Sequence, residues 1–311
     1  MRARLGTGLL CCAILLLGMT ATAIEANGNG DALPYELIEV SPSVTVARHD
    51  NGSNISCVAL DDGLVFFDAS LSTATAAHFR REMEVRFERP TIALVLTHAH
   101  LDHILGMGAF GDVPVYAAAA GRPRWEHFMA IEWDERSIAG YGSIFPTLPQ
   151  EIETATLRLP TDWFADELVL GSAEDELVIR RTGGHTADSS SAMVESDDVV
   201  IAGDLVQAHR RPYFGEPDTD FSAWIGTLEG WEQLEVKAVC PGHGPVIEVD
   251  ELAAIRVWFE QVSSAMVELK SRGVSFEKAL SDPGLPPGYW PDEESVPRWW
   301  ATCIKRLYDA S

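Results

Sequence analysis

The segment 97–103 constrains this chain more than any other part of its sequence. It presents three histidines and one aspartate in the pattern His-x-His-x-Asp-His, at His98, His100, Asp102 and His103. It directly follows the apolar run 91–96, which is typical of a buried strand. Functional side chains of α/β folds usually lie on loops at strand ends. Because neutral imidazole and carboxylate are ligands that zinc accepts, the pattern predicts a metal site on a short loop.

Three later segments repeat the arrangement of a strand, a glycine and a side chain that can bind a metal. The three side chains are those of His185, Asp204 and His243, each beside one or two glycines. Glycine permits unusual backbone angles and close approach at a site. Each of these residues alone is a weak signal, but together with the first cluster they give seven ligands. Seven ligands exceed the needs of one tetrahedral zinc and suit two metals with positions open for water.

In these motifs the chain resembles the metallo-β-lactamase superfamily. The matching motifs are His-x-His-x-Asp-His at 98–103, Gly-His-Thr at 184–186, Gly-Asp at 203–204 and Pro-Gly-His-Gly at 241–244. The resemblance covers roughly residues 38–250. It implies an α/β fold, a four-layer αββα sandwich with the site at one edge of its two sheets, here followed by extra C-terminal helices.

The resemblance also implies a binuclear centre with two zinc ions per chain, with iron or manganese as the alternative metals. By this resemblance the first metal is held by His98, His100 and His185. The second metal is held by Asp102, His103 and His243, and Asp204 bridges the two.

The chemistry expected from such a centre is hydrolysis by a metal-bound hydroxide. Two metals that share a water lower its pKa, polarise a carbonyl and stabilise the leaving atom, so no serine or cysteine nucleophile is needed. We assign the catalytic role to Asp102 and Asp204 through the metals that they hold. Asp68 and Thr186 are expected to orient the imidazoles, and Asp188 is a weaker candidate for the same role.

The sequence therefore predicts an exported metal-dependent hydrolase that cleaves a small-molecule acyl bond in an ester, lactone, thioester or β-lactam-type amide. Aspartate at position 204, where class B1 β-lactamases have cysteine, is similar to the glyoxalase II-like and lactonase-like members. The acidic, lysine-poor C-terminal part argues against a glutathione thioester. Two alternatives stay open, namely a mononuclear iron oxidoreductase of the persulfide dioxygenase type and a non-catalytic metal-binding protein.

The charge of the chain restricts its partners. The formal net charge is −24, and only four lysines are present. Such a surface repels phosphate backbones and anionic lipid, which argues against a nucleic-acid partner and against docking on membranes. We expect a small-molecule substrate, and the sequence does not indicate an oligomeric state.

The domain organisation predicted from the sequence is one large domain behind a secretory signal peptide. Residues 1–23 combine a basic start, a short apolar run and an Ala-Thr-Ala cleavage signature, with a membrane anchor as the alternative. The expected location is therefore periplasmic or secreted, without stable membrane association after cleavage. Residues 24–37 are expected to be a loose N-terminus, 38–250 the main domain, and 251–311 a helical extension packed on it.

An aromatic insertion is expected at about residues 111–170. It is interpreted either as a substrate-facing lid or as an aromatic sub-core, and both interpretations could hold for different residues. The residues expected to contact substrate are Trp125, Phe128, Trp133, Tyr213, Phe214, Tyr289 and Trp290. Among the cysteines left after export, Cys57, Cys240 and Cys303 are interpreted as buried thiols, with a ligand role for Cys240 as the alternative.

Overall fold

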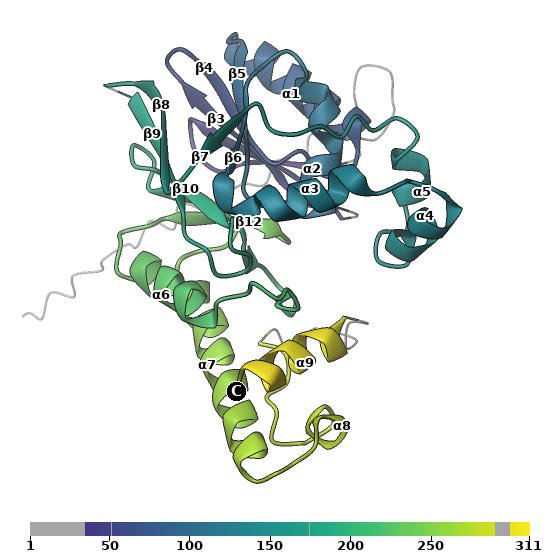
Figure 1. Cartoon of the computed structure of the whole chain (residues 1–311). Coiled ribbons are helices and arrows are strands. Elements are labelled where there is room, and N and C mark those ends of the chain that lie inside the picture. Colours follow the sequence, from purple (N-terminus) through teal and green to yellow (C-terminus); the bar gives the residue numbers. More distant parts are fainter. Residues whose placement is uncertain (1–34, 51, 174, 290–298) are drawn as a thin grey trace, which may run out of the picture.

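Two β-sheets lie face to face at the centre of the computed structural model, and helices cover their outer faces (Figure 1). The structure describes residues 35–50, 52–173, 175–289 and 299–311. The predicted signal peptide, most of the predicted N-terminal tail and Trp290 lie outside these residues. In the part of the chain that is described, no helix combines the length and apolar character needed to cross a membrane.

The first sheet has seven strands, and they are ordered in space as they are in the sequence. They are β1 (Glu36–Glu39), β2 (Val44–Arg48), β3 (Ile55–Leu60), β4 (Gly63–Phe67), β5 (Thr91–Leu96), β6 (Val115–Ala118) and β7 (Asp162–Phe164). Pairing is antiparallel from β1 to β4 and parallel from β4 to β7. The parallel half places the carboxyl end of β5, and with it the histidine motif, at one edge of the sheet.

The second sheet has five strands in the order β12 (Ala238–His243), β11 (Val199–Gln207), β10 (Ser190–Val194), β9 (Asp175–Arg181) and β8 (Glu167–Ser172). Only β11 and β12 are parallel. Apolar side chains of both sheets, including Val46, Val65, Ile179 and Ile201, form one buried cluster between them. This cluster is the inner core of the sandwich.

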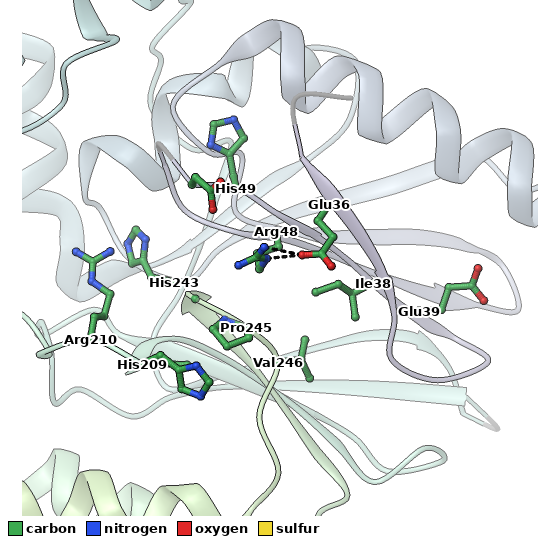
Figure 2. A pocket seen from close by; sticks show the side chains of 13 residues that line it. Glu36, Ile38, Glu39, Arg48, His49, His209, Arg210, His243, Pro245 and Val246 are labelled. Atoms are coloured by element: carbon green, nitrogen blue, oxygen red, sulfur yellow. Dashed lines mark hydrogen bonds and ion pairs between the residues drawn. The ribbon is translucent and has the colours of Figure 1, made fainter. Parts of the chain in front are cut away.

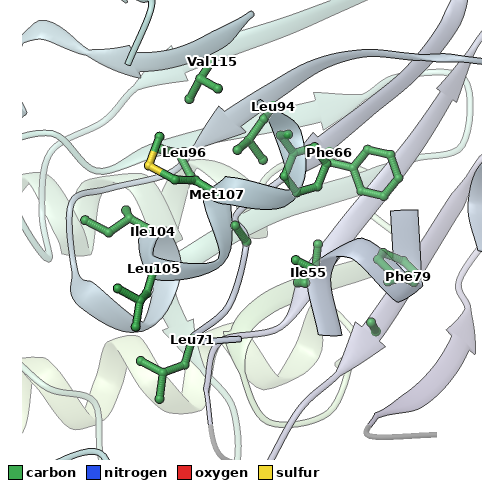
Figure 3. Packing of buried hydrophobic residues seen from close by; sticks show 14 of the residues in the cluster. Ile55, Phe66, Leu71, Phe79, Leu94, Leu96, Ile104, Leu105, Met107 and Val115 are labelled. Carbon is green, nitrogen blue, oxygen red and sulfur yellow. The ribbon is translucent and has the colours of Figure 1, made fainter. Parts of the chain in front are cut away.

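The outer face of the first sheet is covered by α1 (Thr73–Phe87), α2 (Leu101–Ile104) and the 3-10 helix η1 (Leu105–Phe110). Figure 3 shows Phe66, Leu94 and Leu96 of the sheet beside Phe79 of α1 and Met107 of η1. The Ser72 side chain accepts a hydrogen bond from the Thr75 amide and so caps the start of α1. The cap therefore fixes the start of α1 at Thr73.

The outer face of the second sheet is covered by α6 (Phe221–Glu232) and α7 (Asp250–Ser271). The last helix, α9 (Trp300–Ala310), follows the single turn α8 (Phe276–Ala279) and packs against α7 (Figure 1). Along α7 the buried residues Leu252, Ile255, Phe259, Val262 and Met266 recur at intervals of three or four, the spacing of one helix face. The four layers and the additional C-terminal helices agree with the predicted fold class.

The segment 111–170 differs from the predicted insertion. Its ends contain β6 and β7 of the first sheet, and its last residues begin β8 of the second sheet. The part between β6 and β7 lies outside the sheets and includes η2 (Ala119–Gly121), α3 (Arg122–Ala130), α4 (Glu135–Gly142) and α5 (Leu148–Glu151). The strands β6 and β7 have four and three residues, so they are too short to show a periodic pattern in the sequence. At the other end of the domain, β1 begins at Glu36, inside the segment predicted to be loose.

Candidate metal centre

The side chains that could bind a metal lie together at one edge of the two sheets. The motif 98–103 follows β5, and His100 directly precedes α2. His185 lies between β9 and β10, Asp204 lies within β11, and His243 is the last residue of β12. Residues that are up to 145 positions apart in the sequence are thus collected by the sheet topology.

These side chains form two groups whose ligand atoms lie within 4.8 Å of one another in each group. We call His98, His100 and His185 the first ligand group, and Asp102, His103 and His243 the second ligand group. In the first group, Nδ1 of His100 is 2.9 Å from Nε2 of His98 and 3.1 Å from Nε2 of His185. In the second group, Oδ2 of Asp102 is 3.2 Å from Nε2 of His243 and 3.9 Å from Nε2 of His103.

Asp204 lies between the two groups and directs one oxygen to each. Its Oδ2 is 3.5 Å from Nε2 of His185 and 4.0 Å from Nε2 of His98. Its Oδ1 is 3.2 Å from Nε2 of His103 and 3.4 Å from Nε2 of His243. The carboxylate therefore has the position that a bridge between two metals requires.

The inward nitrogens are free to bind metal because the outward nitrogens are already engaged. In the first ligand group, Nδ1 of His98 is 3.1 Å from Thr97 Oγ1, whose own hydroxyl donates to Asp68. Nδ1 of His185 donates to the Tyr213 carbonyl at 2.9 Å. Within the described residues, the buried atoms His103 Nε2 and Asp204 Oδ1 have no hydrogen-bond partner. Convergent imidazole lone pairs and carboxylate oxygens without donors fit divalent cations.

Burial sets the protonation of His98 and His185. It lowers the pKa of His185 to about 3, and it lowers the pKa of His98 together with the neighbouring histidines. Both imidazoles are therefore neutral near pH 7, the form that binds a metal.

In the second ligand group, burial alone would raise the pKa of Asp102, but His103 and His243 outweigh it and lower this pKa to about 2. The carboxylate is thus ionised, as a ligand must be.

Asp68 holds the imidazole of His103, a member of the second ligand group, by a hydrogen bond. It is buried, and its Oδ2 accepts a hydrogen bond from His103 Nδ1 at 2.8 Å. The Thr97 amide and hydroxyl donate to the same carboxylate, each at 2.8 Å. These contacts confirm the predicted orienting role of Asp68, and they tie the end of β5 to the end of β4.

The other two predicted orienting residues act differently. Asp188 accepts a hydrogen bond from the Ala99 amide at 2.9 Å, so it holds the loop backbone between two ligands rather than an imidazole. Thr186 Oγ1 lies 3.0 Å from Ser189 Oγ within its own turn. The prediction that Thr186 orients an imidazole is therefore wrong, because its hydroxyl points into the turn that follows His185.

The structure adds a carboxylate that the sequence analysis missed. Oε1 of Glu216 accepts a hydrogen bond from Nε2 of His100 at 3.1 Å, and Oε2 lies 3.1 Å from Nη2 of Arg124. Arg124 also binds Asp218 at 2.8 Å, and the Tyr213 hydroxyl donates to Glu216 at 3.2 Å. Glu216 lies in an irregular loop without a motif, so only its place in the fold reveals its contact with His100.

The residues predicted to contact substrate are dispersed. Trp125, Phe128 and Phe214 are buried in the hydrophobic cores, so the expectation of direct contact is corrected to a packing role. Trp133 is partly buried against the first core. Tyr289 donates its hydroxyl to the Gln207 carbonyl at 2.7 Å. Among the described residues of this set, Tyr213 lies beside the centre, with its ring centroid 5.9 Å from that of His100. The sequence alone does not show whether an aromatic side chain points into a core or toward the metal centre.

A cavity of about 710 Å³ adjoins the second ligand group, and His243 is part of its lining (Figure 2). Its walls come from β1, from the end of β2, from residues 208–210 after β11, and from residues 243–246 after β12. The side chains of His100 and His243 are 16% and 10% exposed, whereas those of His98, His103 and His185 are almost completely buried. Access to the centre is thus from the side of His100 and His243.

Comparison with known proteins gives one family and several relatives. The profile of the metallo-beta-lactamase superfamily matches residues 50–243, which include all seven ligands. A probable metallo-hydrolase of Streptococcus pyogenes serotype M6 is 27% identical over 168 residues, 51% of this chain and 66% of that protein. A linear primary-alkylsulfatase of Pseudomonas sp. is 23% identical over 269 residues, 74% of this chain and 50% of that protein. The chain therefore spans one half to two thirds of the length of these relatives.

Solved structures show the same fold at low sequence identity. The stereoselective inverting sec-alkylsulfatase Pisa1 from Pseudomonas sp. superposes with a TM-score of 0.65 at 19% identity, over 89% of this chain and 50% of that one. A metallo-beta-lactamase from Pontibacter korlensis gives a TM-score of 0.54 at 19% identity, over 73% of this chain and 99% of that one. The sulfatase superposes on a larger part of this chain than the metallo-beta-lactamase does, so the structural similarity to the sulfatase includes residues that the metallo-beta-lactamase does not match.

Proposed function

The chain belongs to the metallo-beta-lactamase superfamily, and from this premise we propose that it is an exported hydrolase with two zinc ions that cleaves an acyl bond of a small molecule. The bond is that of an ester, lactone, thioester or β-lactam-type amide. The observation that supports two metals rather than one is the position of Asp204, with one carboxylate oxygen toward each ligand group. Export assigns the protein to the periplasm or the exterior of the cell.

The protein side chains would supply binding and orientation for this reaction. The first and second ligand groups would each hold one divalent ion, and Asp204 would touch both. Bound zinc ions would polarise the scissile carbonyl and lower the pKa of water, so that hydroxide exists near neutral pH. Glu216 and Asp68 keep His100 and His103 in the orientation that presents one ring nitrogen to the centre.

A second candidate function is the hydrolysis of alkyl sulfate esters. It is favoured by the two Pseudomonas alkylsulfatases. One matches 74% of this chain in sequence, and the other superposes on 89% of it, whereas the metallo-beta-lactamase from Pontibacter korlensis superposes on 73%. The reaction differs in the bond that is cleaved, because the electrophile is sulfur or the carbon next to the ester oxygen rather than an acyl carbon.

The test combines metal analysis with a substrate panel on the purified protein. Elemental analysis should find two zinc ions per chain, and at least one chromogenic ester, lactone or cephalosporin should be cleaved. Asp204→Ala should abolish this turnover, whereas Asp166→Ala, at a carboxylate 79% exposed and paired with Arg181, should leave it unchanged. Cleavage of an alkyl sulfate alone would select the second candidate. One iron per chain with oxygen uptake would reject both in favour of an oxidoreductase.

A further inference from the structure

His243 differs from the other four histidines of the two ligand groups in how its ring is held. The outward ring nitrogen of each of the other four contacts a neighbouring residue, namely Thr97, Tyr213, Glu216 or Asp68. The ring of His243 borders the cavity, and no hydrogen bond within the described ranges holds its Nδ1 (Figure 2). Its Nε2 nevertheless lies 3.2 Å from Asp102 and 3.4 Å from Asp204. The direction of this imidazole therefore depends on the backbone that carries it.

One side chain outside the two ligand groups holds the backbone on both sides of His243. The side-chain amide of Asn54 donates hydrogen bonds to the carbonyl oxygens of Pro241 and Gly244, each at 2.9 Å. The backbone amide of Asn54 donates to the carbonyl of Gly242 at 2.7 Å. Asn54 thus binds three of the four carbonyls in the segment 241–244.

The fourth carbonyl, that of His243 itself, is held from β11. It accepts a hydrogen bond from the Ala208 amide at 2.8 Å. The backbone of Gly244 has a φ of +85°, and a Cβ there would lie 2.2 Å from the Ala208 carbonyl oxygen. The turn is therefore fixed between Ala208 on one side and Asn54 on the other, with little room to shift toward β11.

Asn54 is itself fixed by its surroundings. It lies directly before β3, is 3% exposed, and its Oδ1 accepts a hydrogen bond from the His49 amide at 3.2 Å. Two carbonyl acceptors and one amide donor suit the two ends of a side-chain amide in this orientation alone. The preceding residue, Ser53, donates its backbone amide to the Asp102 carbonyl at 3.3 Å. Residues 53 and 54 thus contact the segments that carry two members of the second ligand group.

We propose that Asn54 is a positioning residue for His243 and thereby sets the metal affinity of the second ligand group. This inference rests on the proposed function, since it concerns one of the two metals of the same centre. A metal site needs its ligands held to within about 0.5 Å, and the hydrogen bonds of Asn54 fix the Cα–Cβ direction from which the imidazole of His243 extends. Asn54 does for His243, through the backbone, what Asp68 does for His103 through the ring.

Two variants separate the hydrogen bonds of Asn54 from its bulk. Asn54→Ala removes both, whereas Asn54→Leu keeps a side chain of similar size that donates nothing. Chelator competition measures zinc affinity in two backgrounds, His98→Ala, which retains the second ligand group, and His243→Ala, which retains the first. In the His98→Ala background both variants should lower zinc affinity by about 10-fold or more. In the His243→Ala background they should change it less than about 2-fold.

The comparison of leucine with alanine tests the hydrogen bonds directly. Leucine should lower zinc affinity at least as much as alanine, because water can enter the space left by alanine and replace part of the lost hydrogen bonds. Undiminished zinc affinity of a folded Asn54→Leu protein, or equal losses in the two backgrounds, would overturn the assignment. If the leucine variant does not fold, the alanine variant decides between the two backgrounds in the same way.

The matched control is a side chain that holds a different turn. Asp197 accepts hydrogen bonds from the amide and the hydroxyl of Ser43 at 3.1 and 2.7 Å, and it precedes β11. Asp197→Ala should lower the urea concentration at which the metal-free protein unfolds and leave zinc affinity unchanged in both backgrounds. An equal loss of second-site affinity in Asp197→Ala would show that general destabilisation, rather than the turn at His243, explains the effect of Asn54.

Nuclear magnetic resonance of the metal-free protein separates this inference from the proposed function. The Cε1 signal of the His243 ring should shift or relax differently in Asn54→Ala, while that of His103, held by Asp68, should stay unchanged. If the original protein binds fewer than two zinc ions, the proposal of two zinc ions fails, and an altered His243 ring still supports the role of Asn54. A His243 ring with unchanged signals and relaxation would overturn that role at any zinc stoichiometry.

Discussion

Oε1 of Glu216 lies 3.1 Å from Nε2 of His100, whose other ring nitrogen lies 2.9 Å from His98 and 3.1 Å from His185. The carboxylate therefore decides which nitrogen of this imidazole faces the centre. Burial would raise the pKa of Glu216, but the contacts with His100 and Arg124 outweigh it and lower this pKa to about 2. Glu216 is thus ionised and accepts a hydrogen bond from the imidazole N–H of His100.

Replacing Glu216 should weaken the metal held by the first ligand group. Loss of an outer partner of a metal-binding histidine typically lowers metal affinity 10–100-fold. We expect this for Glu216→Ala and a smaller loss for Glu216→Gln, whose amide oxygen still accepts a hydrogen bond. Competition of zinc with a chromophoric chelator measures the affinity of each site. Glu229→Gln, at an exposed position of α6, is the control, and equal affinities in all variants would contradict the orienting role.

The loop that contains Glu216 is held by the C-terminal helix. Arg306 of α9 donates to the carbonyls of Glu216 and Thr219 at 3.0 and 3.1 Å. The Thr219 hydroxyl in turn donates to the His185 carbonyl at 3.0 Å. The C-terminal extension, which follows all seven ligands in the sequence, therefore helps to shape the first ligand group.

Arg306→Ala should accordingly reduce zinc affinity at the first ligand group, by less than Glu216→Ala does, because it frees the loop without removing a ligand contact. The neighbouring Lys305 is 51% exposed and pairs with Asp309, so Lys305→Ala should leave the affinity unchanged. If Arg306 acts through Glu216, the double variant should lose no more affinity than Glu216→Ala alone. Losses that add in full would show that the two residues act independently.

Local sequence was enough to identify the candidate ligands that the fold brings together, because metal chemistry restricts the residue types and strand ends restrict their places. His98, His100, Asp102 and His103 form a recognisable unit, and glycines mark His185, Asp204 and His243. Glu216 could not be found in this way, since it meets its partner across 116 residues and lies in no repeated pattern. The sequence also did not show which way an aromatic side chain points. Phe214 packs in the hydrophobic core, whereas its neighbour in the sequence, Tyr213, lies beside His100.

The three described cysteines should be unreactive in the folded protein. Cys57, Cys240 and Cys303 are free and buried, which confirms their interpretation as buried thiols. Burial raises the pKa of all three, that of Cys303 to about 12, from an ordinary value of 9.0. The folded state thus keeps protons that the unfolded state releases at lower pH. The resulting stabilisation is complete below pH 9 and is lost as the pH rises from about 9 toward 12.

Two measurements check this pH dependence on a protein that begins at Ile24, so that Cys11 and Cys12 are absent. A disulfide reagent that reports free thiols should label fewer than one cysteine at pH 8 in the native state and three in urea. The free energy of unfolding should decrease between pH 9 and pH 11, and this decrease should be smaller in Cys303→Ala. Rapid labelling of the native protein at pH 8 would show that the thiols are accessible.

Among the glycines beside the candidate ligands, Gly242, next to His243, leaves the least room for a side chain. A Cβ at this position would lie 2.1 Å from Oδ1 of Asp204 and 2.8 Å from the carbonyl carbon of Gly203. Neither atom can move away easily, because Oδ1 faces the second ligand group and Gly203 is part of β11. Gly242→Ala should therefore displace the Asp204 carboxylate from between the two groups and reduce the affinity for both metals, with the second site affected more.

Gly140 of α4 has nothing within 4 Å of the corresponding Cβ, so Gly140→Ala should bind zinc like the original protein and gain up to about 1 kcal/mol of stability from its helix. Chelator competition measures both zinc affinities, and urea unfolding of the metal-free proteins separates a loss of ligand geometry from a loss of folding. Undiminished zinc binding by a folded Gly242→Ala protein would mean that Asp204 does not bridge the two groups.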